Sequence, residues 1–467
     1  MKLVMKFGGV SVADGERMRH AASLVKNFQN KNEVVAVISA LAGMTNQLQE
    51  MAHKAAESGS GQTPTSIKKF VNQTAKKHTD AIRSIRDERI EAESLKSVSD
   101  RLEELENGLL GIFHLGEVTE RSLDYIMSFG ERLAAPIFAG MLRSLELDAV
   151  PLTGGEAGII TDEKFGNATP LANSEGKISK RLAPRMKKGA VPVVTGYIGE
   201  TKKGALTTLG RGGSDYTATI IGAALNAGEI WLWKETDGIM STDPKLVPEA
   251  RTLPVVSYTE AMELSYFGAQ VLHPRAMEPA MRKGIPIRVK NVFKPDIDGT
   301  VIQKEPDKNG HAVKAISVIK NVALVNLSGT EMVGTPGSAG RIFSALGKSG
   351  VNIIMISQGS SERTISMIID GGHMKKALGA LETEFGKTLL KDIVYEGDVC
   401  AIAVVGAGMR GTPGVAGRIF SCLGKNGVNV MMIAQGSSEH NISFVIKKEQ
   451  AQAALRAVHD EFELNRR

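Results

Sequence analysis

Short apolar runs alternate with longer stretches of helical spacing along the chain ahead of residue 294. Five of these runs have the length of buried strands: residues 2–7, 34–39, 191–195, 230–233 and 286–289. Residues 65–145 are poor in proline and glycine, which predicts a mostly helical segment. Strands that alternate with helices favour a parallel sheet with helices on both faces.

The C-terminal part contains an internal repeat. The segment M-V-G-T-P-G-S-A-G-R-I-F-S from Met332 recurs in register as M-R-G-T-P-G-V-A-G-R-I-F-S from Met409, and both copies continue to Q-G-S-S-E. Each copy has the pattern strand, helix, strand, strand, helix, which predicts a small sheet with helices on one face. The expected elements are strands at 323–327, 351–356 and 401–405 and helices at 339–346, 373–385 and 449–462.

Composition places the chain among globular proteins of more than one domain. It has 467 residues, of which 42% are hydrophobic and 23% charged. No run approaches the ~20 apolar residues of a membrane span, and the N-terminus lacks the apolar core of a secretory signal. Cys400 and Cys422 have no metal-type spacing, so we expect no disulfide framework and a cytoplasmic location.

The net charge of +6 is spread along the chain, and aromatic residues make up only 5%. This distribution argues against a nucleic-acid surface, because such surfaces cluster their basic residues. A mild positive excess also suits small anionic substrates.

The first predicted strand ends in Lys6-Phe7-Gly8-Gly9. Two glycines after a strand let backbone N–H groups approach a phosphate, and Lys6 would add a positive charge to a transferring phosphoryl group. The alternative is a tight strand-to-helix turn with a surface lysine.

A second glycine-rich cluster surrounds Arg211 in T-T-L-G-R-G-G-S-D-Y-T-A, just before a predicted helix. Glycines, an arginine and a helix start together form an anion site, and arginine can hold a carboxylate through two parallel hydrogen bonds. Ser214 and Asp215 are good N-cap residues for that helix. The alternative is plain capping with a solvated arginine.

Four further segments are candidates for ligand contacts. The loop Ser39–Asn46 follows the strand at 34–39, where ligands bind in open α/β sheets. Glu131, in S-F-G-E-R-L, could hold an ammonium group, although a solvated helix carboxylate is the simpler interpretation. The remaining two are W-L-W-K-E-T-D-G-I-M-S-T-D-P-K from Trp231 and F-G-A-Q-V-L-H-P-R from Phe267, in which His273 before a proline indicates a structural turn.

Two motifs imitate nucleotide-binding sequences. Gly406–Gly411 spells G-x-G-x-x-G, but its repeat partner has lost the middle glycine and no acidic residue follows at the required distance. Gly347-Lys348-Ser349 imitates the end of a P-loop, but it is predicted to close a helix rather than open one. We therefore expect no dinucleotide site here.

The ordered set of motifs resembles the aspartate kinase family over nearly the whole chain, and the repeats resemble its amino-acid-sensing ACT domains. The resemblance implies an N-terminal amino-acid-kinase αβα sandwich with a mostly parallel sheet, followed by tandem ACT domains of βαββαβ, ferredoxin-like fold. The implied domains are residues 1–303 for the kinase, 320–396 for the first ACT domain, and 304–319 with 397–467 for the second, split ACT domain.

The resemblance also implies site residues. Lys6 and Asp215 would be catalytic, and the aspartate pocket would comprise Ser39, Thr45, Glu131, Arg211 and Ser214. ATP would contact Lys6, Gly8, Gly9, Lys234, Glu235, Met240, Lys245 and Gln270. Several of these nucleotide positions, and Val10, depart from the family pattern. Mg²⁺ would be carried by ATP, with no metal held by the protein alone.

A regulatory amino acid is implied as well. Its site would include Met332, Gly334, Thr335, Gly337, Gln358, Ser360, Glu362 and Gln435, with threonine as the first expectation and lysine as the second. Family members pair through their ACT domains, which predicts a homodimer or a dimer of dimers. The chain ends after the repeats, so no fused homoserine dehydrogenase is expected.

The predicted reaction is transfer of phosphate from ATP to L-aspartate, giving ADP and 4-phospho-L-aspartate, at the first step towards lysine, threonine and methionine. Alternatives are a kinase acting on glutamate, acetylglutamate or UMP, a catalytically inactive amino-acid sensor, or an NAD-dependent dehydrogenase. The last of these depends on the Gly406–Gly411 motif alone.

Overall fold

The structure is a computed structural model that describes residues 1–57, 63–268, 272–306, 312–328, 337–359, 364–389 and 393–466. The chain divides into two compact units. The first comprises Met1–Ile239, Pro254–Tyr258 and Leu272–Glu305, and the second Met240–Leu253, Thr259–Val271 and Pro306–Arg467. The domain boundaries implied by the family resemblance remain a prediction.

The first unit is built on a mostly parallel sheet, as expected. Its strand order is β3-β5-β2-β1-β8-β10-β11-β9, and only β10 and β11 pair antiparallel. All five predicted runs form strands of this sheet. The strands are β1 (Lys2–Phe7), β2 (Glu33–Ile38), β3 (Ala149–Leu152), β5 (Val191–Thr195), β8 (Glu229–Lys234), β9 (Val255–Ser257), β10 (Ile287–Asn291) and β11 (Thr300–Gln303).

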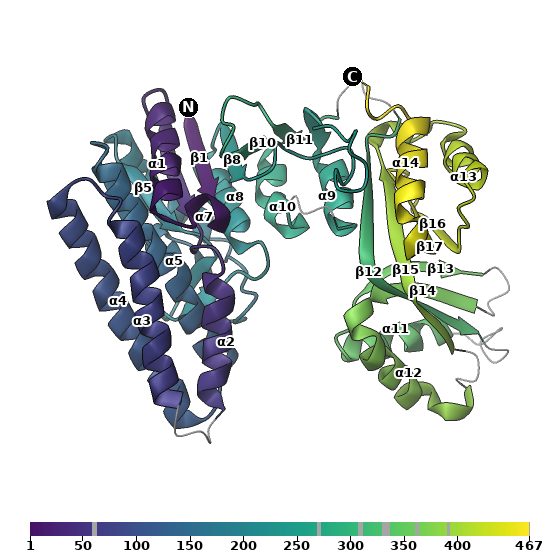
Figure 1. The fold of residues 1–467 in the computed structure, drawn as a ribbon, viewed down its shortest axis with the longest axis horizontal. Helices are drawn as coiled ribbons and strands as arrows, with labels where there is room; N and C mark the ends of the chain where they lie inside the picture. Colours follow the sequence, from purple (N-terminus) through teal and green to yellow (C-terminus); the bar gives the residue numbers. More distant parts are fainter. Residues whose placement is uncertain are drawn as a thin grey trace. The chain divides into compact units, whose positions relative to one another are not determined.

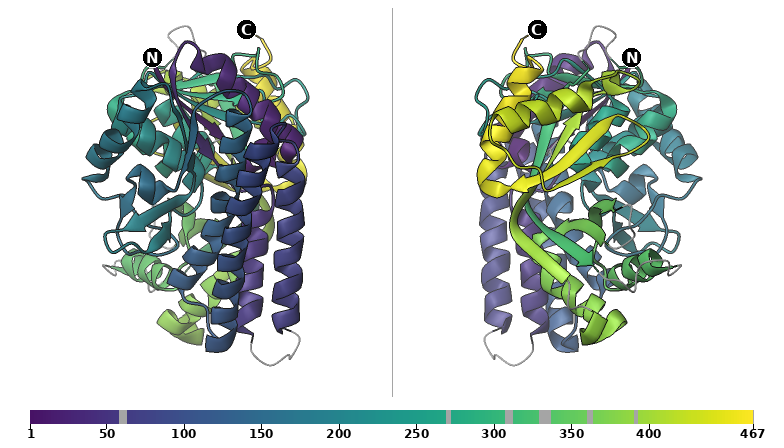
Figure 2. Two further views of the ribbon diagram at one scale, coloured as in Figure 1. Left: turned by 90° about the vertical axis from the view of Figure 1, so that its left-hand side faces the viewer. Right: turned by 90° about the vertical axis from the view of Figure 1, so that its right-hand side faces the viewer.

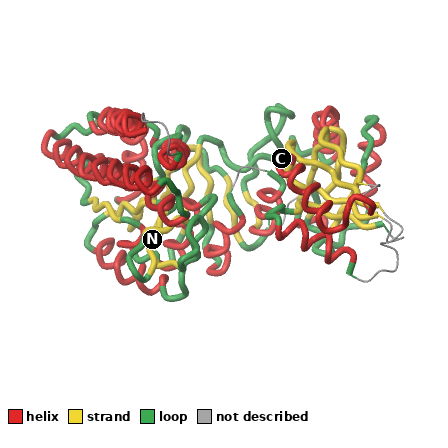
Figure 3. The backbone as a smooth tube through the Cα atoms, turned by 90° about the horizontal axis from the view of Figure 1, so that it is seen from below, coloured by secondary structure: helices red, strands yellow, loops and turns green. Residues whose placement is uncertain are grey.

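Helices cover both faces of this sheet (Figure 3). One face packs against α1 (Gly15–Gln29) and α5 (Glu120–Arg143), and the other against α7 (Ser174–Lys187) and α8 (Gly213–Leu225). The predicted helical segment forms α3 (Thr63–Ile82), α4 (Glu88–Leu115) and α5, which lie side by side (Figures 1 and 2). The remaining helices are α2 (Met44–Ala56), α6 (Gly154–Ala157) and α10 (Pro274–Lys283).

A small second sheet precedes α8 along the chain. It consists of β4 (Ile160–Thr161), β6 (Ile198–Thr201) and β7 (Leu206–Thr208) in the order β4-β6-β7. Thr208, the last residue of β7, is followed at once by the glycine-rich segment around Arg211. The position of that segment therefore depends on both the small sheet and α8.

The second unit contains one antiparallel sheet in the order β13-β14-β12-β15-β17-β16. The repeat is visible in its element order, because each copy contributes a long strand, a helix, two strands and a second helix. The elements are β12 (Ala315–Ser328), α11 (Ser338–Lys348), β13 (Ile353–Gln358), β14 (Thr364–Asp370), α12 (Met374–Leu389), β15 (Ile393–Val405), α13 (Val415–Lys425), β16 (Met432–Gln435), β17 (Asn441–Lys447) and α14 (Ala451–Glu461), with α9 (Tyr258–Tyr266) from the middle of the chain.

Alternate residues of this second sheet enter different cores. Ala323 and Val325 of β12 pack with residues of α11 and α12, whereas Val322 and Leu324 pack with sheet residues from the opposite face. Successive strand residues point to opposite faces, so both faces of the sheet are buried. β12 and β15 are longer than the runs predicted at 323–327 and 401–405 because they pair along two stretches, Ala315–Ile319 with Ala401–Val405 and Leu324–Leu327 with Ile393–Glu396.

One detail of the prediction is corrected. The strand expected at 351–356 is β13, which begins at Ile353 because the chain is still in the turn after α11. The Gly406–Gly411 motif forms a short 3-10 turn, and α13 begins only at Val415. In agreement with the sequence, Gly347 and Lys348 are the last two residues of α11. Within the residues that the structure describes, no helix has both the length and the apolar character needed to cross a membrane.

Aromatic rings support the carboxyl ends of the central strands. Phe7 of β1 stacks parallel to Trp233 of β8 with ring centroids 6.1 Å apart, and Phe138 of α5 lies 5.6 Å from Phe7. All three side chains are fully buried. The rings therefore join one helix layer to the two strands whose ends carry Lys6 and Lys234.

We expect Phe138→Ala to lower the free energy of unfolding of the first unit by about 3–5 kcal/mol, because it leaves a cavity beside Phe7. Urea unfolding followed by tryptophan fluorescence measures this unit selectively, since both tryptophans of the chain lie in β8. Asn27→Ala, at an exposed position of α1, is the control and should change the value by less than about 0.5 kcal/mol. Equal effects of the two substitutions would contradict the described packing.

Candidate active site

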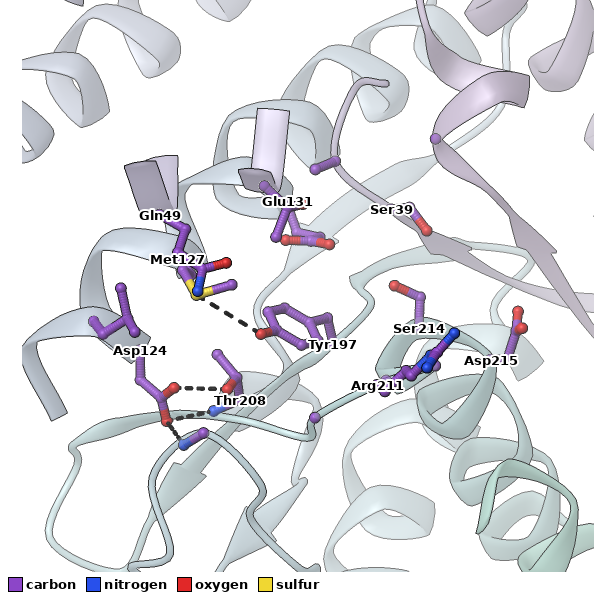
Figure 4. Close-up of a pocket in the computed structure, with 18 of the residues that line it drawn as sticks. Ser39, Gln49, Asp124, Met127, Glu131, Tyr197, Thr208, Arg211, Ser214 and Asp215 are labelled. Atoms are coloured by element: carbon purple, nitrogen blue, oxygen red, sulfur yellow. Dashed lines mark hydrogen bonds between the residues drawn. The ribbon is translucent and has the colours of Figure 1, made fainter. Parts of the chain in front are cut away.

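A cavity of about 620 Å³ opens in the first unit where β1, β2 and β7 end (Figure 4). Eight residues predicted from the sequence line it, although they come from four separate segments of the chain. They are Lys6, Gly9, Ser39, Thr45, Glu131, Arg211, Ser214 and Asp215. The parallel strands β1 and β2 bring their carboxyl ends to one edge of the sheet, which explains how the first two segments meet. Glu131 comes from α5, and residues 211–215 come from the start of α8 after β7.

A buried carboxylate joins two lysines at this edge. Lys6 Nζ lies 2.7 Å from Asp215 Oδ1, and Lys234 Nζ lies 3.4 Å from Asp215 Oδ2. Lys6 is paired with Leu232 across β1 and β8, so Lys6 and Lys234 lie on the same face of the sheet. Burial alone would raise the pKa of Asp215, but the charges and hydrogen bonds of Lys234 and Lys6 lower it to about 2. Asp215 is therefore ionised at neutral pH.

The surroundings of Glu131 favour its protonated form, whereas those of Asp215 favour the ionised form. Glu131 is 3% exposed, and its Oε2 has no hydrogen-bond partner among the described residues. Burial raises its pKa to about 8, against the lowering effects of the Ala40 N–H group, its own N–H group and the charge of Lys6. The solvated-helix interpretation of Glu131 is therefore wrong. A cationic ligand group would satisfy the unpartnered oxygen.

The loop after β2 is held between Gly9 and Lys77. A Cβ atom at Gly9 would lie only 3.0 Å from the carbonyl oxygen of Ala40, so a larger residue would displace the loop. On the other side, Lys77 of α3 donates a hydrogen bond of 2.7 Å to the carbonyl of Ala42. Ser39 and Thr45 are thereby fixed at the cavity wall.

The glycine-rich segment before α8 presents Arg211 to the cavity. The N-cap of α8 is Gly212, with φ of 72°, and not Ser214 or Asp215 as predicted. Glycine adopts this left-handed conformation without strain, which moves the helix start upstream and places Ser214 and Asp215 inside the first turn. Arg211 is exposed and has no ion-pair partner among the residues described, so its guanidinium group is available to an anion.

Other cavity residues were not predicted from the sequence. Tyr197 has φ of 66° and donates its N–H to Thr217, and its hydroxyl lies 4.0 Å from the sulfur of Met127. Burial raises the pKa of this hydroxyl to about 12, so it stays protonated. Asp124 accepts hydrogen bonds from both the N–H and the hydroxyl of Thr208 (Figure 4). The glycines around Tyr197 in T-G-Y-I-G were the one available signal.

The remaining predicted nucleotide contacts that the structure describes are spread over both units of the chain. A Cβ atom at Gly8 would lie 3.5 Å from Lys6 Nζ, so Gly8 adjoins the lysine. The side chain of Glu235 is exposed, and Met240 and Lys245 belong to the second unit. Gln270 lies outside the described residues. The roles of these residues remain predictions.

Only part of the predicted effector site is described. Gly337 is the N-cap of α11, and Gln358 and Gln435 are the exposed last residues of β13 and β16, which are equivalent strands of the two repeats. The other predicted residues lie outside the described ranges: Met332, Gly334, Thr335, Ser360 and Glu362. This assignment also remains a prediction.

Comparison with known proteins finds one family in the N-terminal part of the chain and another, twice, in the C-terminal part. Residues 1–291 match the amino acid kinase family, and residues 325–385 and 402–462 match an ACT domain. Aspartokinase 1, chloroplastic, of Arabidopsis thaliana is 36% identical in an alignment that covers 98% of this chain and 80% of that protein.

Two crystal structures of E. coli aspartokinase III are similar to this chain throughout. The complex with aspartate and ADP has a TM-score of 0.80 and 26% identity, and the alignment covers 99% of this chain and 100% of that chain. The complex with lysine and aspartate has a TM-score of 0.82 and 27% identity, and the alignment covers 99% of each chain. The chain therefore belongs to the aspartokinase family, with an N-terminal domain of the amino acid kinase family and C-terminal tandem ACT domains.

Proposed function

We propose that this protein is an aspartate kinase that transfers the γ-phosphoryl group of ATP to the side-chain carboxylate of L-aspartate. The products are ADP and 4-phospho-L-aspartate, the first step towards lysine, threonine and methionine. One observation carries the proposal: a single cavity is lined by Lys6, by Arg211 and by Glu131. Among the described residues Arg211 has no ion-pair partner, and the buried Oε2 of Glu131 has no hydrogen-bond partner.

The substrate fits the charges of the cavity. The guanidinium group of Arg211 would hold the α-carboxylate in a bidentate pair, and Glu131 would hold the ammonium group. Ser39, Thr45 and Ser214 supply hydroxyl groups around the same space. The side-chain carboxylate would then be directed towards Lys6, which lines the same cavity.

The acceptor needs no strong general base. An aspartyl carboxylate has a reference pKa of ~3.9, so it is already an ionised nucleophile at neutral pH. One of its oxygens forms a bond to the γ-phosphorus while the bond from that phosphorus to the β,γ-bridging oxygen breaks, and ADP leaves with the electron pair. Catalysis therefore depends on alignment and on neutralising the charge of the transferring group.

Lys6 and the Gly8-Gly9 backbone would perform this task, and Lys234 adds a second ammonium group near Asp215. Asp215 would orient both lysines. Mg²⁺ would enter with ATP, because it is usually bound by substrate phosphates together with one or two carboxylates, and the ionised Asp215 is a suitable donor. The ion would neutralise phosphate charge when bound.

Aspartate-dependent release of ADP, combined with trapping of the acyl phosphate by hydroxylamine, tests the function. We expect both signals with aspartate and neither with glutamate, acetylglutamate or UMP. A preference for one of those acceptors would replace the proposal with another kinase. The absence of ADP release with every acceptor would favour an inactive sensor.

We also propose feedback inhibition by threonine, with lysine as the second candidate. Gly337 and Gly414 are the equivalent left-handed N-caps of α11 and α13, with φ of 91° and 87°, and helix N-termini can bind an amino-acid carboxylate. Inhibition requires that the effector bind more tightly to a state with misplaced kinase loops. The ADP assay with each amino acid separates the candidates, and insensitivity to both would reject this regulation.

Assembly as a homodimer, or a dimer of dimers, through the ACT domains is supported by the ends of the second sheet. Its edge strands β13 and β16 expose Ile356 and Ile433, which are 43% and 44% exposed. Exposed apolar edge strands are surfaces on which a second copy can add strands.

We expect Lys6→Ala to lower kcat by roughly 10² or more, because the charge that stabilises the transferring phosphoryl group is lost. Steady-state kinetics with saturating ATP and aspartate measures this. Lys26→Ala, on the outer side of α1, is the control and should leave kcat unchanged. A near-normal kcat for Lys6→Ala would remove Lys6 from the catalytic machinery.

The raised pKa of Glu131 gives a pH prediction. The ionised carboxylate binds the substrate ammonium group, and Glu131 in the free protein is largely protonated below its pKa of about 8. The kcat/KM for aspartate should therefore rise as the pH rises from 6 to about 8. Glu131→Gln should lower kcat/KM roughly ten- to hundredfold at pH 8 and remove this rise. A wild-type profile that is flat over this range would contradict the role of Glu131.

Stability provides a control for the same variant. The folded pKa of Glu131 lies above its unfolded value of 4.5, so the unfolded state loses this proton first as the pH rises. The contribution of Glu131 to stability therefore falls between pH 4.5 and about 8. Glu131→Gln should keep or raise the melting temperature at pH 8, so lost aspartate use could not be attributed to unfolding.

A further inference from the structure

The His-Pro-Arg sequence at 273–275 has no part in the proposed reaction, yet Arg275 makes a dense set of contacts. It lies in the first turn of α10, and its guanidinium group lies 5.0 Å from the ring centroid of Tyr216 in α8. It donates hydrogen bonds to the carbonyl of Ala168 at 2.8 Å, to the hydroxyl of Thr169 at 2.9 Å and to the side-chain oxygen of Asn167.

Arg275 also reaches the segment that carries Arg211. A longer hydrogen bond of 3.5 Å runs from its guanidinium group to the carbonyl of Leu209, two residues before Arg211. The neighbouring His273 packs against the same segment, since a Cβ atom at Gly212 would lie 2.8 Å from His273 Cβ. The start of α10 therefore contacts both sides of Arg211.

The two segments joined by Arg275 both line the cavity. Gly166 belongs to the loop 162–169, and Gly210 belongs to the segment before α8. They approach closely, because a Cβ atom at Gly210 would lie 2.6 Å from the side-chain oxygen of Asn167, and Gly210 has φ of 75°. The separation of these segments sets the position from which Arg211 can reach a ligand.

A second tether acts on the same two segments from α5. Asp124 accepts hydrogen bonds from the N–H groups of Gly166 and Thr208, at 2.9 and 2.8 Å. Asp124 lines the cavity, whereas Arg275 holds the segments from α10. Each segment is thus fixed by one residue from each of two helices.

The hydrogen-bond partners of Arg275 suggest a positioning role. They are neutral oxygens, and no carboxylate in the described part of the chain lies within ion-pair distance of Arg275. A planar guanidinium group with five donors can bind several oxygens at fixed angles, whereas a lysine ammonium on a flexible stem cannot hold the same set.

We propose that Arg275 is a positioning residue for the acceptor substrate: it locks the loop 162–169 to the segment 209–213 so that Arg211 is held where it can bind the α-carboxylate. The proposal rests on the proposed aspartate kinase function. Loosening this link would displace Arg211 from the carboxylate, whereas Asp215, inside α8, would stay paired with Lys6.

Kinetics of two substitutions at this position test the role. Arg275→Met should lower kcat/KM for aspartate by roughly ten- to hundredfold, mainly through KM, with KM for ATP and the melting temperature near wild type. Arg275→Lys should recover little, because one ammonium group cannot bind all the acceptors. Arg282→Met is the matched control on the same helix: Arg282 pairs with Glu175 at the surface, and its loss should leave the kinetics unchanged.

Two results would overturn the proposal. One is an unchanged KM for aspartate in Arg275→Met. The other is an equal loss with both substrates together with a lowered melting temperature, which would indicate a purely structural arginine. Combining Arg275→Met with Asn167→Ala should add little further loss, because both changes break the same link.

Hydrogen–deuterium exchange separates this proposal from the proposed function. Amides of residues 162–169 and 206–213 should exchange faster in Arg275→Met than in the wild-type protein, whatever the substrate. If the wild-type protein fails to phosphorylate aspartate, the proposed function is rejected. The exchange data still test whether Arg275 links the loop 162–169 to the segment 209–213. Unchanged exchange of both segments in Arg275→Met would reject this link by Arg275, even if the wild-type protein is an active enzyme.

Discussion

The ion pair between Lys6 and Asp215 is the contact on which the site depends. It joins the end of β1 to the first turn of α8, at 2.7 Å and almost out of contact with solvent. A buried carboxylate is costly unless it is paired, and here two ammonium groups satisfy it. The pair holds the strand against the helix and fixes Lys6 at the cavity wall, where its ammonium group favours an anion.

The two buried carboxylates of the cavity have opposite ionisation behaviour. Asp215 is kept ionised by its lysines, with a pKa of about 2, whereas burial raises the pKa of Glu131 to about 8. Groups whose environments separate their pKa values in this way commonly have different chemical roles. In our account Asp215 orients cations permanently, whereas Glu131 is largely protonated below pH 8 in the free protein and is ionised when it binds a cationic group. The proposed function assigns phosphate to the region around Asp215 and the substrate ammonium group to Glu131.

The sequence predicted the fold well because its signals were local. Apolar runs marked the strands of the first sheet, and the duplicated segment from Met332 and Met409 marked the second unit. The meeting of Lys6, Glu131 and Arg211 was implied by family resemblance, and spacing along the chain could not have shown it. The burial of Glu131 depends on packing between α5 and the loop after β2. Asp124, Thr208 and Arg275 act through contacts between distant segments, and their residue types carry no local signal for such a role. The helix start at Gly212 was misplaced because Ser214 and Asp215 are also suitable caps.

The central claim is that one cavity holds both substrates between Lys6 and Arg211. A crystal structure of the protein with aspartate and a non-hydrolysable ATP analogue tests it most directly. Our account predicts the α-carboxylate at hydrogen-bond distance from Arg211, about 3 Å, the ammonium group beside Glu131, and the γ-phosphate beside Lys6. Aspartate bound away from Arg211, or a nucleotide whose phosphates do not approach Lys6, would contradict it.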